Sequence, residues 1–554
     1  MVTKRVDPVL VIKVILAFTF LFFPNYSFLH GQETIYKYFY RIYFTDKGEK
    51  NLTDFEPVDL LSSKAIDRRG KAGITVPDWR DIPVCSEYIK QIITAGFKLH
   101  CTSKWMNTAL FKTETLTDLN SIQNLPFISE IKIVKNPAGK NGFHDKLFFR
   151  TEQTDYPPFD RPVSMLNGHP VHNSGFDGKG ILIAVLDAGF TDADKIPSLN
   201  ALHKREGIKG TYDFVKNDKF VYGYHNHGTA VLSVLAGRIP DRIEGTAPGA
   251  DYWLLRTEDD DTEFPVEEDY WAAGAEFADS TGADIISSSL GYFTFDDPVL
   301  NYKYQDMNGN NTFITQVADI AASKGIMVVS SAGNERNKEW IHIIAPSDGD
   351  SVIAVGAVDG NNLLSSFSSS GPSADGRIKP DIVAQGVSVP VQTTSSTIER
   401  ANGTSFSCPI ISGMCACIMQ AVPKADNKNL IDALHSSSDR YEHPDSLYGF
   451  GIPDMVTVIS YLQNLLITKP QNETVISPNP FTSDFYVTFK KSPEWMKLEI
   501  FTPSGITIVK RSYKDYISRT IKITDLQSVP QGLYFIRVTT VNGIFTNKII
   551  KINN

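Results

Sequence analysis

Four polar residues in the middle of the chain could together perform nucleophilic acyl transfer. In chain order they are Asp187, His227, Asn334 and Ser405. The serine hydroxyl would supply the nucleophile, the histidine the base that removes its proton, the carboxylate the group that orients this base, and the amide a donor for the oxyanion. Each residue type alone is common in caps, turns and surfaces, so the prediction depends on all four occurring in this order with their flanking residues.

The segments around these residues predict an α/β domain that would bring them to one edge of a sheet. Asp187 and Asn334 follow short apolar runs, whereas His227 and Ser405 would each begin a helix. Because such runs are typical of strands buried on both faces, and helix-like segments lie between them, we expect a parallel sheet with helices on both faces. The runs are 181–186, 252–255, 285–286, 326–329 and 352–355, and the helix-like segments are 227–236, 270–280 and 317–324.

Several longer motifs lie between residues 180 and 455. They are Gly245-Thr246-Ala247-Pro248, Ser288-Ser289-Leu290-Gly291, Phe367 to Pro372, Lys379 to Ala384, and Gly403 to Pro409, which contains Ser405. This set, with the order of the four polar residues, resembles the subtilisin-like serine proteases, or subtilases. The order Asp, His, Ser is the known order of that family's triad.

The resemblance implies a secreted serine endopeptidase that hydrolyses polypeptides through an acyl-enzyme intermediate. It implies that Ser405 is the nucleophile, His227 the general base and then acid, and Asp187 the carboxylate that orients the base. The Asn334 side chain and the Ser405 backbone N–H would form the oxyanion hole. Substrate backbone would pair as an added strand with the segment Ser289, Leu290, Gly291. Independently, the start of a helix would favour the negative charge that develops beside Ser405.

Two departures from the family pattern bear on activity. Ala188 stands where the family usually has Thr or Ser, and Gln385 where it often has Pro. They motivate an alternative, a non-catalytic surface-binding protein on a subtilase scaffold. All four reacting positions are filled, which favours the enzyme.

The resemblance implies that no cofactor is required for the chemistry, and it allows a structural calcium ion. Asp306, Asn308 and Asn310 have the one-three-five spacing of a calcium loop, but Asn311 and Val317 stand where such a loop needs Gly and Glu. A polar surface turn is therefore the favoured interpretation, and no metal-binding residue is assigned.

An acidic stretch from Glu258 to Asp269 holds eight carboxylates. It could line the substrate cleft and favour basic peptides. The simpler interpretation, which we favour, is that Glu267, Glu268 and Asp269 occupy the first turn of the next helix, where acidic residues are stabilising.

Length and composition exclude several classes of protein. The chain has 554 residues, too many for one small domain, and its 54 basic and 63 acidic residues give a net charge of −9. This balance excludes a broad basic surface for nucleic acid. Five cysteines are too few for a disulfide scaffold. Cys85 and Cys101 would either pair in an oxidising compartment or remain two separate buried thiols.

The N-terminal third predicts two segments before the catalytic domain, which we place at 155–465. Residues 1–31, with a basic start and the apolar run 14–23, are typical of a cleaved signal peptide. Residues 32–150 read as an α+β unit, which we expect to be a propeptide that assists folding and blocks the cleft. The stretch Leu61 to Arg69 resembles Bacteroidetes subtilase prosegments. A permanent accessory domain is the alternative.

Residues 470–554 alternate polar and apolar residues in short runs separated by turns, which predicts a small β-sandwich. Ser477-Pro478-Asn479-Pro480-Phe481 and Gly532-Leu533-Tyr534-Phe535 resemble the sorting domains of type IX secretion cargo. That resemblance implies the outer-membrane secretion machinery as a partner, and release or attachment at the cell surface. A sandwich that binds substrate or glycan is the alternative.

Overall fold

The structure is a computed structural model that describes residues 36–137, 157–468, 474–489, 492–514, 520–541 and 543–552. The expected signal peptide at 1–31 lies outside these residues. The chain divides into two compact units, Met1–Leu462 and Gln463–Asn554, each of which is described by itself.

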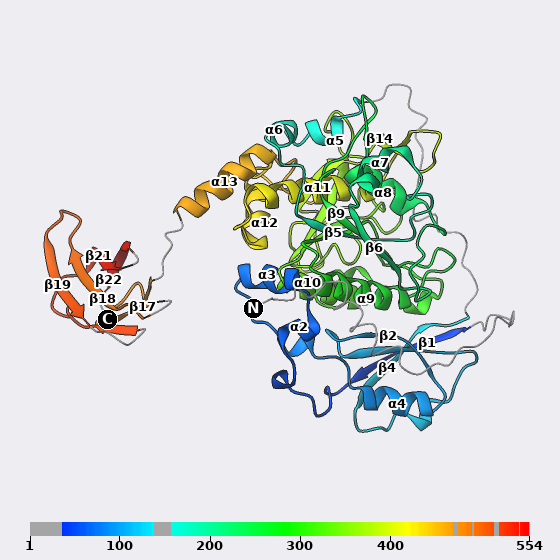
Figure 1. Ribbon diagram of the computed structural model, residues 1–554, viewed down its shortest axis with the longest axis horizontal. Coiled ribbons are helices and arrows are strands. Elements are labelled where there is room, and N and C mark those ends of the chain that lie inside the picture. Colours follow the sequence, from blue (N-terminus) through cyan, green and yellow to red (C-terminus); the bar gives the residue numbers. More distant parts are fainter. Residues whose placement is uncertain are drawn as a thin grey trace, which may run out of the picture. The chain divides into compact units, whose positions relative to one another are not determined.

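A seven-stranded parallel sheet forms the centre of the first unit (Figure 1). Its strand order is β13-β12-β11-β10-β5-β9-β6, which confirms the parallel α/β prediction. The two edge strands, β6 and β13, were not predicted; β6 is rich in polar residues, and β13 overlaps the motif Lys379 to Ala384. The strands are β5 (Leu182–Asp187), β6 (Ile208–Asp213), β9 (Asp251–Arg256), β10 (Ile285–Ser288), β11 (Met327–Ser331), β12 (Val352–Val358) and β13 (Ile382–Gln385).

Four main helices cover the sheet. Helices α9 (Val266–Thr281) and α10 (Phe313–Ser323) pack against each other, as do α8 (His227–Ala236) and α11 (Thr404–Ala421). The first pair lies between the sheet and the N-terminal domain, and the second lies on the other face (Figure 1). Among the described residues α11 alone is long and apolar enough to span a membrane, but 83% of it is buried, as expected of a core helix.

Further elements complete the first unit. They are α5 (Arg161–Ser164), α6 (His169–Asn173), α7 (Asn200–Lys204), β7 (Arg238–Ile239), β8 (Ile243–Glu244), β14 (Val389–Val391), β15 (Glu399–Ala401), α12 (Asn427–Ser436) and α13 (Met455–Thr468), of which α13 continues into the second unit.

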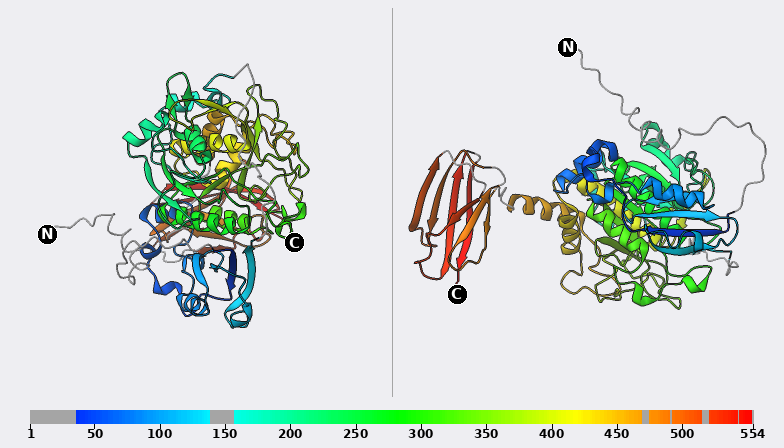
Figure 2. Two further views of the ribbon diagram at one scale, coloured as in Figure 1. Left: turned by 90° about the vertical axis from the view of Figure 1, so that its right-hand side faces the viewer. Right: turned by 90° about the horizontal axis from the view of Figure 1, so that it is seen from below.

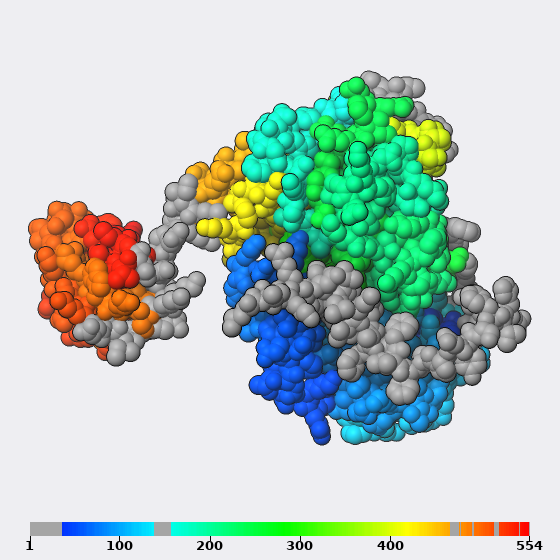
Figure 3. Space-filling view, in the orientation of Figure 1, coloured from blue at the N-terminus to red at the C-terminus, as the bar shows by residue number. Residues whose placement is uncertain are grey.

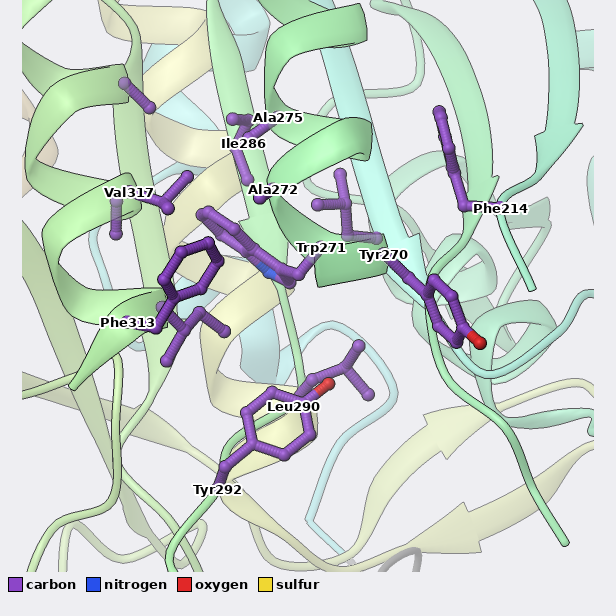
Figure 4. Packing of buried hydrophobic residues seen from close by; sticks show 14 of the residues in the cluster. Phe214, Tyr270, Trp271, Ala272, Ala275, Ile286, Leu290, Tyr292, Phe313 and Val317 are labelled. Atoms are coloured by element: carbon purple, nitrogen blue, oxygen red, sulfur yellow. The ribbon is translucent and has the colours of Figure 1, made fainter. Parts of the chain in front are cut away.

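An aromatic core joins α9 and α10 to the sheet. Trp271 projects from α9 toward Phe313 of α10, close to Ile286 of β10 (Figure 4). The fully buried indole Nε1 donates a hydrogen bond to Ser288 Oγ at 3.0 Å. Because Ser288 ends β10, this bond fixes the point where the chain enters the segment 289–291.

The N-terminal domain is built on a four-stranded antiparallel sheet of order β2-β3-β1-β4; α4 packs against β2, whereas α3 packs against α9 of the catalytic domain. Side chains of β1 alternate between two cores: Tyr40 and Ile42 pack inside the domain, whereas Phe39 packs into the core of the catalytic domain. The elements are β1 (Tyr38–Phe44), α2 (Pro57–Leu60), α3 (Ser63–Lys71), α4 (Ser86–Thr94), β2 (Lys98–Ser103), β3 (Thr108–Thr113) and β4 (Ile128–Lys135).

Buried ion pairs join this domain to α9. Arg41 Nε donates to Asp269 Oδ1 at 2.9 Å, and its planar group lies 3.5 Å from the centre of the Phe313 ring. Arg69, fully buried, bonds Asp81 of its own domain and Asp279 of α9. In the space-filling view the blue surface of residues 57–71 lies directly beside the catalytic domain (Figure 3). Buried charges are costly unless paired, so this interface requires both partners.

The second unit consists of two antiparallel sheets that share one hydrophobic core, consistent with the predicted small β-sandwich (Figure 2). Their orders are β16-β17-β20 and β19-β18-β21-β22. The strands are β16 (Thr474–Ser477), β17 (Phe485–Phe489), β18 (Trp495–Phe501), β19 (Thr507–Lys514), β20 (Thr520–Ile523), β21 (Gly532–Thr540) and β22 (Gly543–Lys551).

Candidate active site

Asp187 and His227 form a buried hydrogen-bonded pair at the carboxyl edge of the sheet. Asp187 is the last residue of β5, and His227 is the first residue of α8. The Nδ1 atom of His227 lies 2.8 Å from Asp187 Oδ1, and both side chains are almost wholly buried. A proton on Nδ1 would therefore be held by the carboxylate, which leaves Nε2 as the nitrogen that can exchange a proton with a reactant.

Ser405 lies in the first turn of α11, next to this pair in the fold. Helix α11 packs on α8, and the ring of Phe406, the residue after the serine, lies 5.8 Å from the His227 ring between centroids. In this structure Ser405 Oγ donates a long hydrogen bond of 3.4 Å to Ser289 O. Because Ser405 is in the first turn of α11, the positive end of the helix dipole lies at the serine.

Asn334 follows β11 and lies beside the start of α11. Its Oδ1 atom accepts hydrogen bonds from the backbone N and the Oγ1 of Thr404, at 2.9 and 3.0 Å. These bonds fix the orientation of the amide, with Nδ2 as its donor side. A Cβ atom at Gly403 would lie 3.7 Å from both Asn334 Nδ2 and Ser405 N. Two donors are thus grouped around one point, and the φ of 147° at Gly403 favours a residue without a side chain there.

A cleft of about 740 Å³ contains Ser405 and Asn334 in its wall. The segment Ser289, Leu290, Gly291 forms another part of the wall. Ser289 Oγ donates to Ser405 O at 2.9 Å, and Tyr292 exchanges backbone hydrogen bonds with Ala345 just beyond the segment. The predicted substrate-binding segment is therefore anchored at both ends beside the predicted nucleophile.

Both departures from the family pattern have local consequences. The backbone N of Ala188 donates to Asp187 Oδ1 at 2.8 Å, but among the described residues none donates to Oδ2 of this buried carboxylate. A Thr or Ser at 188 would bring a hydroxyl to that vicinity. Gln385 ends β13 and its Nε2 donates to Val387 O at 3.0 Å, so its side chain closes the following turn.

Two residues beside the site position its groups. Thr404 orients the Asn334 amide, and His225 Nδ1 accepts a hydrogen bond from the backbone N of His227 at 3.1 Å. Burial lowers the pKa of His225, and the neighbouring His227 lowers it further, which favours the neutral ring that can accept this bond. The position of Thr404 inside the serine motif was the signal that could have identified it.

The remaining chemical candidates have ordinary structural surroundings. Asn308 Oδ1 accepts hydrogen bonds from the backbone N atoms of Asn310 and Asn311, and the Asn311 amide lies 3.4 Å from Asp306 Oδ1. These contacts fit a self-closed polar turn better than a calcium loop. The three cysteines of α11 are buried free thiols, and Cys85 and Cys101 are free rather than bridged.

The fold and the site define a serine peptidase built on a parallel α/β sheet. Comparison with known proteins finds a family match in each of three parts of the chain, and the central match agrees with this class. Residues 178–451 match the subtilase family, residues 39–146 the peptidase S8 propeptide domain of Bacteroidota, and residues 475–553 the secretion system C-terminal sorting domain.

Curated relatives include bacterial subtilisins. Subtilisin E of Bacillus subtilis (strain 168) is 29% identical over 293 residues, which span 52% of this chain and 68% of that protein. Subtilisin of Bacillus pumilus is 28% identical over 293 residues, spanning 52% of this chain and 94% of that protein. The central domain belongs to the subtilase family, and the protein is an exported serine endopeptidase made with a propeptide and a sorting domain.

Proposed function

We propose that Asp187, His227 and Ser405 are the catalytic triad of this protease. The observation that carries the proposal is the buried 2.8 Å contact between His227 Nδ1 and Asp187 Oδ1, with Ser405 at the start of the adjoining helix. Asp187 holds the imidazole in the tautomer whose Nε2 accepts a proton. It also stabilises the imidazolium that forms when this proton arrives.

Attack by Ser405 Oγ on the substrate carbonyl transfers the hydroxyl proton to His227 Nε2. The serine gives up its long bond to Ser289 O in this step, because the hydroxyl must turn toward the histidine. The tetrahedral intermediate places its negative oxygen between Asn334 Nδ2 and Ser405 N, the two donors grouped near Gly403. His227 then protonates the leaving amine as the C–N bond breaks, which leaves the acyl group as an ester on Ser405 Oγ. Water, deprotonated by His227, attacks this ester, and the carboxylic acid product leaves as Ser405 regains its proton.

The substrate binds as an extended polypeptide beside Ser289, Leu290 and Gly291. This wall segment is held by Trp271 at its start and by the Tyr292–Ala345 pairing at its end, so its backbone is pre-arranged. Pairing of main chain with main chain gives affinity for any extended peptide, whereas the side chains of the cleft give selectivity. No cofactor takes part in these steps.

The N-terminal domain acts as an inhibitor that is removed after folding. Its last described strand, β4, ends at Lys135, which bonds Asp259, and the next residue, Asn136, bonds Asp297 at 2.7 Å. Both acceptors belong to the segments that lead into the cleft wall. The sorting domain in turn directs the chain to the outer-membrane secretion machinery.

The test compares the wild-type chain with Ser405→Ala and with Ser407→Ala, a buried serine two residues along the same helix. We expect the wild type and Ser407→Ala to release the propeptide and to react with a fluorophosphonate probe. Ser405→Ala should stay full-length and unlabelled. Equal processing and labelling of all three chains would contradict the assigned nucleophile, and no labelling of folded wild type would contradict the triad.

A further inference from the structure

A second group of ionisable side chains lies away from the catalytic cleft, where the start of the catalytic domain meets a short hairpin. His169 and His172 belong to α6, Glu244 belongs to β8, and Asp160 precedes α5. None of these four residues lines the cavity that contains Ser405. The His172 side chain is the most buried of the four, with 13% of its surface exposed, and the other three are half-buried.

Two imidazole nitrogens flank one carboxylate oxygen in this group. Glu244 Oε1 lies 3.4 Å from His172 Nδ1 and 3.6 Å from His169 Nδ1. The two histidines are three positions apart on α6, a spacing that places side chains on the same face of a helix. Imidazole nitrogen and carboxylate oxygen are both common ligands of transition metals.

The other nitrogen of each ring is already engaged. His172 Nε2 lies 3.0 Å from Thr246 O, and a carbonyl oxygen can only accept, so Nε2 carries the ring proton. His169 Nε2 lies 3.0 Å from Asp160 Oδ2, and this carboxylate holds a proton on Nε2 in the same way. In the neutral rings both Nδ1 atoms therefore present lone pairs to the Glu244 carboxylate.

Lone pairs that face a carboxylate repel it unless a positive charge lies between them. A metal cation supplies this charge without a change of tautomer, because it binds the neutral imidazole. In a tetrahedral zinc site the bonds of about 2.0–2.2 Å place neighbouring N and O ligand atoms roughly 3.3–3.5 Å apart. The distances of 3.4 and 3.6 Å from Glu244 Oε1 to the two Nδ1 atoms are close to this separation.

The outer partners of the two rings are those of metal-binding histidines. Such histidines almost always donate their other N–H to a carboxylate or a backbone carbonyl, which fixes the tautomer and the orientation of the ring. Asp160 has this position beside His169, and Thr246 O has it beside His172. The tautomer that metal binding requires is therefore set by the protein itself.

We propose that His169, His172 and Glu244 bind one Zn²⁺ ion, with water as the fourth ligand. Two imidazoles and one carboxylate suit Zn²⁺, whereas Ca²⁺ takes oxygen ligands. The ion is structural, because it joins α6 to the segment after β8. In that segment Thr246 Oγ1 donates to Pro409 O of α11 at 3.3 Å, so the ion stabilises the packing of the helix that carries the nucleophile. This inference is independent of the catalytic assignments.

The experiment uses the full-length chain with Ser405→Ala, which prevents self-cleavage, after EDTA treatment and dialysis. Isothermal titration calorimetry with ZnCl₂ measures the stoichiometry and the dissociation constant, and thermal unfolding is followed with and without ZnCl₂. We expect one Zn²⁺ per chain and a melting temperature about 5 °C higher at roughly 100 times the dissociation constant. Co²⁺ in place of Zn²⁺ should give the visible spectrum of a tetrahedral complex.

Variants then locate the ion. His169→Gln and Glu244→Gln, at half-buried positions, each remove one ligand and should abolish the zinc-dependent rise in melting temperature. Asp160→Ala removes only an outer partner and should weaken Zn²⁺ binding by roughly 10- to 100-fold. His443→Gln is the matched control, since His443 is an exposed histidine outside the group, and it should bind Zn²⁺ as the parent chain does.

Several results would overturn the proposal. A parent chain that binds no Zn²⁺, or whose melting temperature Zn²⁺ does not raise, refutes it and leaves the group as ion pairs of protonated histidines. Binding that survives both ligand substitutions places the ion elsewhere in the chain. Equal weakening in His443→Gln identifies adventitious binding to surface histidines. A larger rise in melting temperature with CaCl₂ than with ZnCl₂ contradicts the choice of ion.

Discussion

We expect the propeptide to bind the enzyme with lower affinity in acid, because of His100. The imidazole is buried in the interface, with Nε2 2.9 Å from Phe214 O of the catalytic domain and Nδ1 3.1 Å from Lys112 Nζ. Nε2 therefore carries the ring proton and donates it to the Phe214 carbonyl, and Nδ1 accepts a hydrogen bond from the lysine ammonium. Burial, with the charge of Lys112, lowers the pKa of His100 from 6.5 to about 4.

The direction and size of the pH effect on propeptide binding follow from this pKa shift. Removal of the propeptide exposes His100 and returns its pKa toward 6.5, so the free propeptide binds a proton that the complex does not. The contribution of His100 to the stability of the complex is complete above pH 6.5 and is lost as the pH falls toward 4. The loss is at most about 3 kcal/mol at the acid limit and roughly 30-fold in binding at pH 5, because Lys112 belongs to the same domain and stays beside His100 after release.

The assay measures dissociation of the processed but still bound propeptide by gel filtration of serial dilutions at several pH values. His100→Gln is the comparison, because its amide can still donate to Phe214 O but does not titrate. Burial raises the pKa of Glu268, Asp269 and Glu276 in the same interface, which strengthens the complex in acid, but this contribution is common to both proteins. Parallel pH curves for wild type and His100→Gln would refute the reasoning.

Two further predictions concern the inhibitor interface and the oxyanion hole. Arg41→Met should weaken propeptide binding by about 3–5 kcal/mol, because it leaves Asp269 and Glu268 buried without their guanidinium partner. The same dilution assay measures this change. An unchanged dissociation constant would contradict the importance of this ion pair. Asn334→Ala should lower kcat by on the order of 10²- to 10³-fold with little change in KM, because the donor acts on charge that develops in the transition state. Steady-state kinetics on one peptide distinguishes this from a binding defect, in which KM would rise instead.

Much of the catalytic domain could be predicted because short stretches of sequence indicate its strands and helix ends. Apolar runs such as 181–186 correspond to strands, and Asp187 directly after this run lies at a strand end as expected. The order of the four polar residues and their flanking motifs implied the site, and the structure places Asp187 and His227 in contact. Helix ends were also readable, since Gly282 and Gly325 follow α9 and α10 with φ of 89° and 82°.

The contacts between domains could not be predicted, because they join residues far apart in sequence. Arg41 and Asp269 are separated by 228 positions, and the sequence around either residue does not indicate the other as its partner. The signal in β1 was a cation in an otherwise apolar run, on the face opposite Tyr40 and Ile42. Such a residue indicates a buried partner without identifying it. Likewise, the acidic loop could be read as a helix start, but its closeness to the cleft required the fold.

Helix α11, which carries the nucleophile, determines how the enzyme loses activity. It packs against four adjacent strands, β10 to β13, and against α8, and it is buried from Thr404 to Ile418. Amides in such a position exchange with solvent only when the whole domain opens. The interior turns of α11, from Cys408 to Ile418, should therefore be among the slowly exchanging parts of the domain, so heat inactivation should report the cooperative melting of the domain rather than fraying around the site.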